Sequence, residues 1–376
     1  NYDHGTSVQV TATPAAGYTF VNWTGSVTSS DNPLTLTMDG NKSLVANYAL
    51  NTYTLTYSAG ANGSLTGTLV QTVEHGGSGT AVEAVPSTGY HFVNWSDSST
   101  ANPRTDTNVT ANITVTANFA IDQFTLTYTV GPNGSLTGTL VQTVDYGGSG
   151  TPVEAVPDIG YHFANWSDGY MNNPRTDTNV QSDISVLANF SINYYTVSYV
   201  AGPNGSISGE QSQSITYGGS GTAVTAVPDT GYYFVDWSDG STANPRTETN
   251  VTAAANLTAN FAALTYTLTY TAGTGGSITG ISPQTVNYGA DGSPVTAVPN
   301  TGYHFVDWSD GVLTATRTDT NVTADISVTA SFALNTYTLA VASDHGTITK
   351  VPDLATYDHG ASVQITATPA TGYSFV

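Results

Sequence analysis

The stretch Gly89-Tyr90-His91-Phe92-Val93-Asn94-Trp95 decides the fold of this chain, because it returns at a constant spacing. Related copies begin at Gly17, Gly160, Gly231 and Gly302, and a shortened copy begins at Gly372. The complete copies hold all five tryptophans of the chain, which are Trp23, Trp95, Trp166, Trp237 and Trp308. One large aromatic ring per unit is typical of a core anchor, because its burial removes about 150–250 Å² of surface from water. The sequence is therefore that of a repeat protein.

The repeat period is about 71 residues, which is the spacing between the aromatic residues that open each unit. These residues are Tyr53, Phe124, Tyr195, Tyr266 and Tyr337. The spacing predicts four full repeats, at 53–123, 124–194, 195–265 and 266–336. It also predicts the back part of a repeat at 1–52 and the front part of another at 337–376.

The two ends of the sequence match each other. Residues 2–21 and 357–376 differ at only four of twenty positions, and their offset is five periods. Two arrangements are open. The chain is a window on a longer array, or the front part of one chain is completed head to tail by the back part of another. Both arrangements predict a fibre-like object.

Charge and composition exclude several classes of partner. The chain has 27 acidic and 6 basic residues and a formal net charge of -21. Nucleic acids and anionic membrane surfaces are bound through basic patches, so neither is an expected partner. There is no cysteine, which excludes disulfides and thiolate metal sites. No apolar run is long enough for a transmembrane helix.

The residue pattern inside one repeat predicts an all-β module. Threonine, tyrosine and valine favour strands, whereas glycine and asparagine favour turns. Alternation predicts short strands near 53–57, 69–73, 81–85, 89–95, 105–109 and 113–119, with a tight turn at Asn62-Gly63. Connectors such as residues 120–123 are short and contain no flexible linker. The expected architecture is a tandem array of small β modules that forms an elongated, semi-rigid rod.

Four parts of the repeat, one of which is the Asn62-Gly63 turn, also resemble a known family. The opening Tyr-Thr-Leu-Thr-Tyr of residues 53–57, the block that ends at Trp95, and the closing Ala117-Asn118-Phe119 resemble the divergent internalin-type B-repeat (Listeria–Bacteroides repeat) family of bacterial surface proteins. The resemblance covers essentially the whole chain. It implies small β-grasp-like modules on secreted or wall-attached proteins, where they act as stalks, spacers or accessory adhesion segments. It therefore implies an extracellular or cell-surface location.

The chain departs from that family pattern in two ways. It is acidic and almost free of lysine, with Lys42 and Lys350 as its only lysines. In addition, any helix of the module would have to lie in residues 102–112, which have the pattern of loop and strand. A small sandwich is therefore the alternative to a β-grasp-like module.

The sequence offers little support for catalysis. His91, His162 and His304 share one repeat position with Tyr233 and Thr19, which is typical of a packed or surface side chain rather than a base. No serine–histidine–aspartate set recurs. The chain is therefore not expected to be an enzyme. Gln71, Gln142 and Gln284 also recur, which leaves a threonine–glutamine ester cross-link open as an alternative.

Recurring acidic residues are weak candidates for calcium ligands. One set follows the tryptophan by two residues, and a second set lies two residues after an arginine. In the first full repeat, Asp97, Asn102 and Asp106 could converge and supply the oxygen ligands that calcium prefers. The alternative is a set of solvated carboxylates, and no other cofactor is expected. The candidates are Asp97, Asp106, Asp168, Asp177, Asp239, Glu248, Asp310 and Asp319.

The arginines are the most informative charged residues. Each has an acidic residue two positions later, so both side chains lie on one face of an extended segment. In residues 1–52 the matching pair is Leu34 and Leu36. One interpretation is a half-exposed ion pair worth roughly 0–1 kcal/mol. The other is a contact between neighbouring repeats. The arginines are Arg104, Arg175, Arg246 and Arg317, and they are the only basic residues of the four full repeats.

These observations favour a structural function. The main hypothesis is an extracellular stalk, fibre or filament on a prokaryotic cell surface, assembled head to tail or laterally from copies of itself. A second hypothesis is a repetitive adhesin that binds glycans or another cell surface. A third is an accessory repeat region of a larger secreted enzyme. Under all three, the tryptophans and arginines are structural residues.

Overall fold

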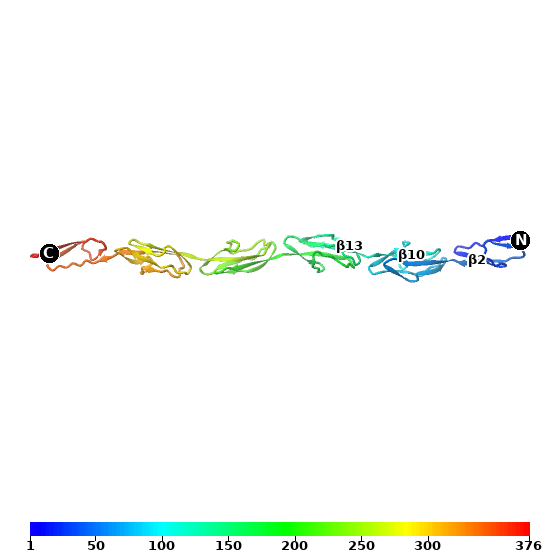
Figure 1. Ribbon diagram of the computed structural model, residues 1–376, viewed down its shortest axis with the longest axis horizontal. Coiled ribbons are helices and arrows are strands. Elements are labelled where there is room, and N and C mark those ends of the chain that lie inside the picture. The colour runs from blue at the N-terminus through cyan, green and yellow to red at the C-terminus, as the bar shows by residue number, and fades with distance from the viewer. The chain divides into compact units, whose positions relative to one another are not determined.

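The computed structural model describes residues 1–376 and contains β-strands but no helix (Figure 1). The all-β fold and its tandem modules are therefore confirmed. Because helices are absent, no helical segment could cross a membrane. The chain divides into two compact units, Asn1–Ser191 and Ile192–Val376, and both units are built from the same kind of module.

The first full repeat shows the module most clearly. Its six strands are β5 (Thr52–Ala59), β6 (Gly63–Thr66), β7 (Val70–Glu74), β8 (Glu83–Pro86), β9 (Tyr90–Trp95) and β10 (Ile113–Ile121). Four of them form a sheet in the order β7-β5-β10-β9, and β6 pairs with β8 in a second, smaller sheet. Within the larger sheet, the central strands β5 and β10 are parallel, whereas the two outer pairings are antiparallel.

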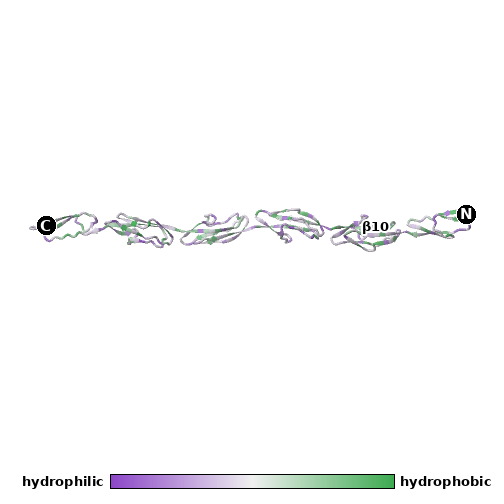
Figure 2. Cartoon of the chain, viewed as in Figure 1, coloured by the Kyte–Doolittle hydropathy of each residue, from purple (hydrophilic) through white to green (hydrophobic).

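Alternation along the strands places one face of the sheet in the core. Leu55 and Tyr57 of β5 are buried, and so are Val115 and Ala117 of β10. Figure 2 shows the corresponding mixture of hydrophobic and hydrophilic residues along the ribbon. The predicted turn is present, because Asn62 has a φ of 69°, a conformation that asparagine tolerates better than most residues.

The smaller sheet covers the larger one and closes the core. Leu65 of β6 and Ala84 of β8 pack with Leu55, Tyr57 and Trp95. Trp95 is fully buried at 0 % exposure, as are its counterparts in the other three full repeats. The tryptophan block is therefore the core anchor. With two sheets and no helix, the module matches the small-sandwich alternative.

One predicted strand is wrong and one observed strand was not predicted. Residues 105–109 form a loop in which Asn108 has a φ of 50° and Val109 turns into the core. Only Arg104 pairs there, through a single bridge to Val82. The missed strand is β6, which follows the Asn62-Gly63 turn. It is hard to detect because it has four residues and pairs with β8 rather than with a neighbour in sequence.

The other full repeats have the same plan. The second contains β11 (Gln123–Val130), β12 (Gly134–Thr137), β13 (Val141–Asp145), β14 (Glu154–Pro157), β15 (Tyr161–Trp166) and β16 (Ile184–Ile192). The third contains β17 (Tyr194–Ala201), β18 (Gly205–Ser208), β19 (Ser212–Thr216), β20 (Thr225–Pro228), β21 (Tyr232–Trp237) and β22 (Ala255–Ala263). The fourth contains β23 (Thr265–Ala272), β24 (Gly276–Thr279), β25 (Gln284–Asn287), β26 (Val295–Pro299), β27 (Tyr303–Trp308), β28 (Thr316–Arg317) and β29 (Ile326–Leu334).

The two terminal segments contain the matching parts of this module. Residues 1–52 hold two strand pairs, β1–β3 and β2–β4, and residues 337–376 with Thr336 hold β30–β32 and β31–β33. The strands are β1 (Ser7–Val10), β2 (Tyr18–Gly25), β3 (Leu34–Thr37), β4 (Leu44–Leu50), β30 (Thr336–Tyr337), β31 (Gly346–Val351), β32 (Tyr357–Asp358) and β33 (Gln364–Pro369).

A single residue joins one repeat to the next. Asp122 lies between β10 and β11, and its N–H donates to the Gly89 carbonyl at 2.8 Å. Its own carbonyl accepts from the Tyr146 N–H at 2.8 Å. Tyr146 also packs so closely over Gly89 that an added Cβ would lie 2.3 Å from its ring. The connectors Asn51, Leu264 and Asn335 make the same two backbone hydrogen bonds.

Candidate functional site

The recurring arginine is positioned by the backbone on both sides of it. Arg104 exchanges two backbone hydrogen bonds with Val82, of 2.8 and 2.9 Å, and its side chain turns into the module. Just before it, the Asn102 side-chain amide accepts from the Ala84 N–H at 2.7 Å and donates to the Ala84 carbonyl at 2.8 Å. This amide fixes the loop against β8, so the direction of the arginine is set.

The guanidinium of Arg104 is held by two carboxylates. Its Nε and Nη2 donate to Asp106 at 2.9 and 2.7 Å, a bidentate pair. Its Nη1 donates to Asp97 at 2.8 Å. Asp106 also accepts from the Tyr57 hydroxyl at 2.7 Å, and the guanidinium lies 5.6 Å from the Trp95 ring centre. We call these five residues the arginine cluster.

The electrostatics of the arginine cluster favour its charged form. Arg104 is only 6 % exposed, so its charge requires partners. Hydrogen bonds from Arg104 lower the pKa of both Asp97 and Asp106 below the ordinary carboxylate value. Burial, followed by the hydrogen bond to Asp106, raises the pKa of Tyr57. At neutral pH the cluster therefore holds one cation, two anions and a neutral phenol.

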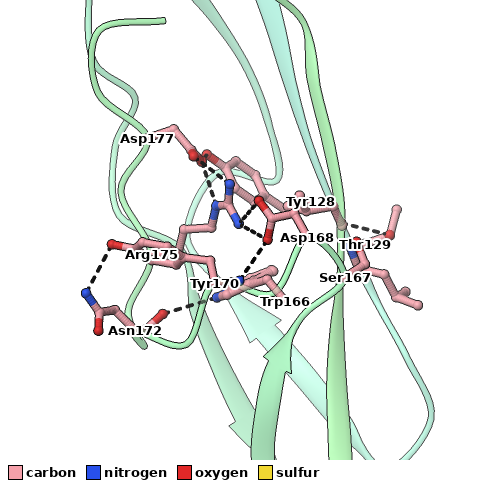
Figure 3. Close-up of polar contacts among 11 residues, drawn as sticks. Tyr128, Thr129, Trp166, Ser167, Asp168, Tyr170, Asn172, Arg175 and Asp177 are labelled. Atoms are coloured by element: carbon pink, nitrogen blue, oxygen red, sulfur yellow. Dashed lines mark hydrogen bonds and ion pairs between the residues drawn. The ribbon is translucent and has the colours of Figure 1, made fainter.

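The second repeat has the same cluster, shown in Figure 3. Arg175 lies between Asp168 and Asp177, and the Tyr128 hydroxyl donates to Asp177 at 2.7 Å. Tyr170 adds a second ring, with the guanidinium 5.0 Å from its centre. The fourth repeat repeats the cluster with Arg317, Asp310, Asp319, Tyr270 and Trp308.

The third repeat departs from this plan. Glu248 replaces the second aspartate and contacts the Nε of Arg246, while Asp239 receives both terminal nitrogens at 2.8 and 2.6 Å. The longer side chain leaves the Tyr199 hydroxyl without a partner, although that oxygen is buried. Tyr199 is the one buried side-chain polar group in the chain that lacks a hydrogen bond.

These positions correct both interpretations of the arginines. Each arginine is between 4 and 8 % exposed, so the ion pair is not half-exposed. Both carboxylates that hold it belong to the same repeat, so it is not a contact between repeats. In residues 1–52, Leu34 pairs with Val10, as Arg104 does with Val82, and both Leu34 and Leu36 are buried. A leucine pair fills the same place without any charge.

The carboxylates that were candidates for calcium ligands bind an arginine side chain instead. Asp97 and Asp106 do converge, but on a guanidinium, which places positive charge where a cation would have to bind. Asn102 does not join them, because both ends of its amide contact the Ala84 backbone. The second, third and fourth repeats have the same arrangement around Arg175, Arg246 and Arg317. The geometry does not support a calcium site.

The remaining recurring polar residues hold loops and connectors. The amide of Gln71 donates to the Thr68 and Thr80 carbonyls at 2.8 and 2.9 Å and accepts from the Thr80 N–H at 2.6 Å. Its contacts are with backbone groups, which does not favour an ester with a threonine hydroxyl. His91 contacts the connector Asp122 at 2.8 Å, and His304 contacts Asn335 at 2.9 Å. Sequence reasoning missed Gln213, which makes the same loop contacts and is also buried.

The unpaired Tyr199 hydroxyl leads to a first prediction. Glu248→Asp should let the carboxylate accept from Tyr199, as in the other three repeats, and should stabilise repeat 195–265 by about 1–3 kcal/mol. The reverse change, Asp177→Glu, should destabilise repeat 124–194 by a similar amount. Hydrogen exchange measured on peptides from each repeat reports both changes. Equal exchange in both variants and the parent chain would contradict the prediction.

The lowered carboxylate pKa values lead to a second prediction. Hydrogen bonds from Arg246 lower the pKa of Asp239 to about 2. A carboxylate whose pKa is lower in the folded state contributes stability that is complete above its ordinary value of 3.8 and is lost as the pH falls toward 2. We therefore expect the melting temperature to be constant between about pH 5 and 7 and to fall below about pH 4.

The control for that titration is salt. Acid also protonates the many exposed carboxylates of this chain and so reduces their mutual repulsion, which would raise the stability of the fold. Salt screens the repulsion between exposed carboxylates at every pH, so it removes this second effect. In high salt the acid-induced fall in the melting temperature, measured by circular dichroism, should be steeper. A melting temperature that rises between pH 5 and 2.5 in high salt would contradict the predicted role of these carboxylates.

Comparison with known proteins agrees with this geometry. The family model described as the divergent InlB B-repeat domain matches residues 1–52, 53–123, 124–194, 195–265, 266–336 and 337–376. A solved structure, the Bacillus anthracis TIE protein, is 10 % identical over 86 % of this chain and 67 % of that chain, with a TM-score of 0.30. That TM-score is too low to indicate a shared arrangement. The repeat family is associated with bacterial surface proteins. Because its matches cover the chain from end to end, this protein belongs to the divergent InlB B-repeat family.

Proposed function

We propose that this chain is a structural, non-catalytic part of a prokaryotic surface protein, where it serves as an extracellular stalk or fibre. The observation that carries the proposal is the connector, a single hydrogen-bonded residue such as Asp122 that joins adjacent repeats within each of the two compact units. Family membership supports the location, and the internal use of the charged residues supports the absence of catalysis.

The polar groups of a repeat are used to build the repeat. The arginine cluster pairs both carboxylates with a buried guanidinium, and the Gln71 amide closes a loop. A catalytic site needs a nucleophile or base that remains free to act on a substrate. The recurring polar residues of this chain instead form hydrogen bonds within their own repeat, which is typical of a structural module.

Contacts at the connectors support the proposal that adjacent repeats within a unit move together. Asp122 is bonded through its N–H, its carbonyl and its side chain, and Tyr146 fits over the bare backbone of Gly89. A flexible linker would have glycine and serine and no such contacts. We infer a semi-rigid array that advances about 40 Å per repeat, because Thr52 and Gln123 are about 13 residues apart along the paired strands β5 and β10 and each strand residue adds about 3.3 Å. Copies assembled head to tail or laterally would extend it into a fibre.

The connector can be tested with spin labels, because the chain has no cysteine of its own. Ser64→Cys and Ser135→Cys place labels at equivalent, exposed positions of two adjacent repeats. Electron–electron double resonance should give a narrow distance distribution centred at about 40 Å, the advance expected from the β5–β10 register. A broad distribution, like that of a flexible linker, would contradict the stalk.

Gly89→Ala provides the matched variant. Gly89 has a φ of 79°, and an added Cβ would lie 2.3 Å from the Tyr146 ring. The ring must therefore move away from the connector. We expect the distance distribution to broaden while both repeats stay folded. Gly169→Ala has a similar φ but no atom near the added Cβ, so it controls for backbone strain alone.

A further inference from the structure

We propose that each repeat is built to carry tension along the chain, and that repeat 195–265 is the first to yield. This inference rests on the proposed structural function and adds a mechanical one, that of a load-bearing tether with a defined weak point. It follows from the strands that receive the pull and from the side chains that connect them.

The chain enters and leaves a repeat on two adjacent parallel strands. β5 is the first strand and β10 is the last, and they pair in parallel from Leu55–Ile113 to Ala59–Ala117. A pull on the chain therefore draws the start of β5 and the end of β10 in opposite directions along the strand axis. The hydrogen bonds between the two strands then resist together rather than one at a time.

Side chains reinforce this strand pair in three of the four full repeats. At its start, the Thr54 N–H donates to the Asn112 side chain at 2.9 Å, and Asp183 and Asp325 accept in the same way in the second and fourth repeats. Toward its end, hydroxyls bridge the strands. The contacts are Ser58 with Thr116 at 2.7 Å, Thr129 with the Val186 carbonyl at 3.0 Å, and Thr271 with Thr329 at 2.7 Å.

The third repeat lacks both reinforcements. Ala254 stands where the other repeats have the side-chain acceptor, and Val200 stands where they have a hydroxyl. Neither residue can make the missing hydrogen bond. The force-bearing pair β17–β22 therefore lacks these two side-chain hydrogen bonds, although it has the same five-residue register as in the other repeats.

Three further features of this repeat point the same way. Ala255 stands where the other repeats have an isoleucine packed against the core. The buried Tyr199 hydroxyl has no partner. At the following connector, Tyr233 and Leu264 replace the polar pair that His91 forms with Asp122. Forced unfolding is governed by the unfolding rate, and each of these losses should raise that rate.

The first experiment tests the direction of loading in one repeat of the full chain. Thr52→Cys with Gln123→Cys attaches handles to the start of β5 and to the residue after β10 and its connector, so the strands are sheared. Ala61→Cys with Gln123→Cys attaches both handles at the same end of the pair, so the strands are peeled apart. All three positions are exposed. We expect several-fold higher unfolding forces in the sheared geometry, and equal forces would overturn the load-bearing function.

The second experiment tests the order of yielding by pulling the full chain from its two ends. Each full repeat should release up to about 250 Å of chain, given about 3.5 Å per extended residue. One of the four such events should occur at a distinctly lower force. Val200→Thr with Ala254→Asp should raise that force to the level of the others. The matched change in the second repeat, Thr129→Val with Asp183→Ala, should create a second low-force event.

The outcomes separate this inference from the function beneath it. An unchanged low-force event in the Val200→Thr, Ala254→Asp chain would overturn the assignment of the weak repeat. A narrow spin-label distance with equal sheared and peeled forces would retain the stalk and remove the tether. A broad spin-label distance with a large difference between sheared and peeled forces would remove the semi-rigid stalk and retain the load-bearing tether.

Discussion

Replacing Arg104 with leucine should lower the free energy of unfolding of repeat 53–123 by about 3–5 kcal/mol, because a buried ion pair that loses one partner leaves charge without compensation. Asp106, whose side chain is only 13 % exposed, would keep the Tyr57 hydroxyl as its one side-chain donor. Peptide-level hydrogen exchange of the full chain would show faster exchange in this repeat. Repeat 266–336, which is distant in sequence, provides the internal reference.

The chain itself offers a control for this prediction. Residues 1–52 have Leu34 and Leu36 in the same places, both buried and without charge. The double variant Arg104→Leu, Asp106→Leu should therefore regain most of the lost stability. The Tyr57 hydroxyl would then lack a hydrogen-bond partner, as the Tyr199 hydroxyl does. A double variant that is no more stable than Arg104→Leu would show that the cost comes from packing rather than from unpaired charge.

Trp166→Ala should destabilise repeat 124–194 by about 3–5 kcal/mol, the range for removing a large aromatic side chain from a core. The ring is fully buried and contacts Tyr128 and Phe163 at centroid distances of 5.9 and 5.7 Å. Its Nε1–H donates to the Asn172 carbonyl at 3.2 Å, so the loop before Arg175 would also lose a contact.

Denaturant unfolding followed by fluorescence, together with peptide-level hydrogen exchange, measures the loss of stability in repeat 124–194. Ile159→Ala is the matched control in the same repeat, because Ile159 is 84 % exposed and its truncation should change stability by no more than about 0.5 kcal/mol. A loss below about 1 kcal/mol for Trp166→Ala would contradict its role as core anchor. Repeat 266–336, which is distant in sequence from Trp166, should keep its exchange rates.

The fold could be predicted from sequence where the signal was periodic. The tryptophan block and the alternation of Tyr53, Leu55 and Tyr57 indicate repeated, half-buried strands, and both are present. β6 was missed because short strands that pair with a distant partner carry little local pattern. Residues 105–109 have the sequence pattern of a strand but form a loop. Asn108 has a positive φ, and Asp106 of this segment is hydrogen-bonded to Arg104.

The candidate site was predicted only in part. The Arg104–Asp106 pair could be predicted, because its two residues are only two positions apart in the sequence. Asp97 and Tyr57 join the same cluster from distant parts of the repeat, and only the folded chain brings them together. Burial was misjudged for the same reason. An arginine near a strand end is usually exposed, and its burial here depends on the tryptophan and tyrosine that cover it.

The third repeat shows what comparison of the copies can add. Val200, Ala254 and Ala255 are visible in the sequence as departures from the other repeats. Their meaning depends on strand register, since it is the pairing of β17 with β22 that places them along one path. Small repeats of limited core gain stability from neighbours and from each hydrogen bond, so such departures should matter more here than in a large domain.

The length of the purified chain in solution tests the central claim most directly. If the proposed stalk is correct, electron microscopy of single particles should show narrow, elongated objects on the order of 200 Å long, about 40 Å for each repeat, with a narrow spread of end-to-end distances. Compact particles, or strings that bend freely between repeats, would contradict the account of this chain as a semi-rigid structural array.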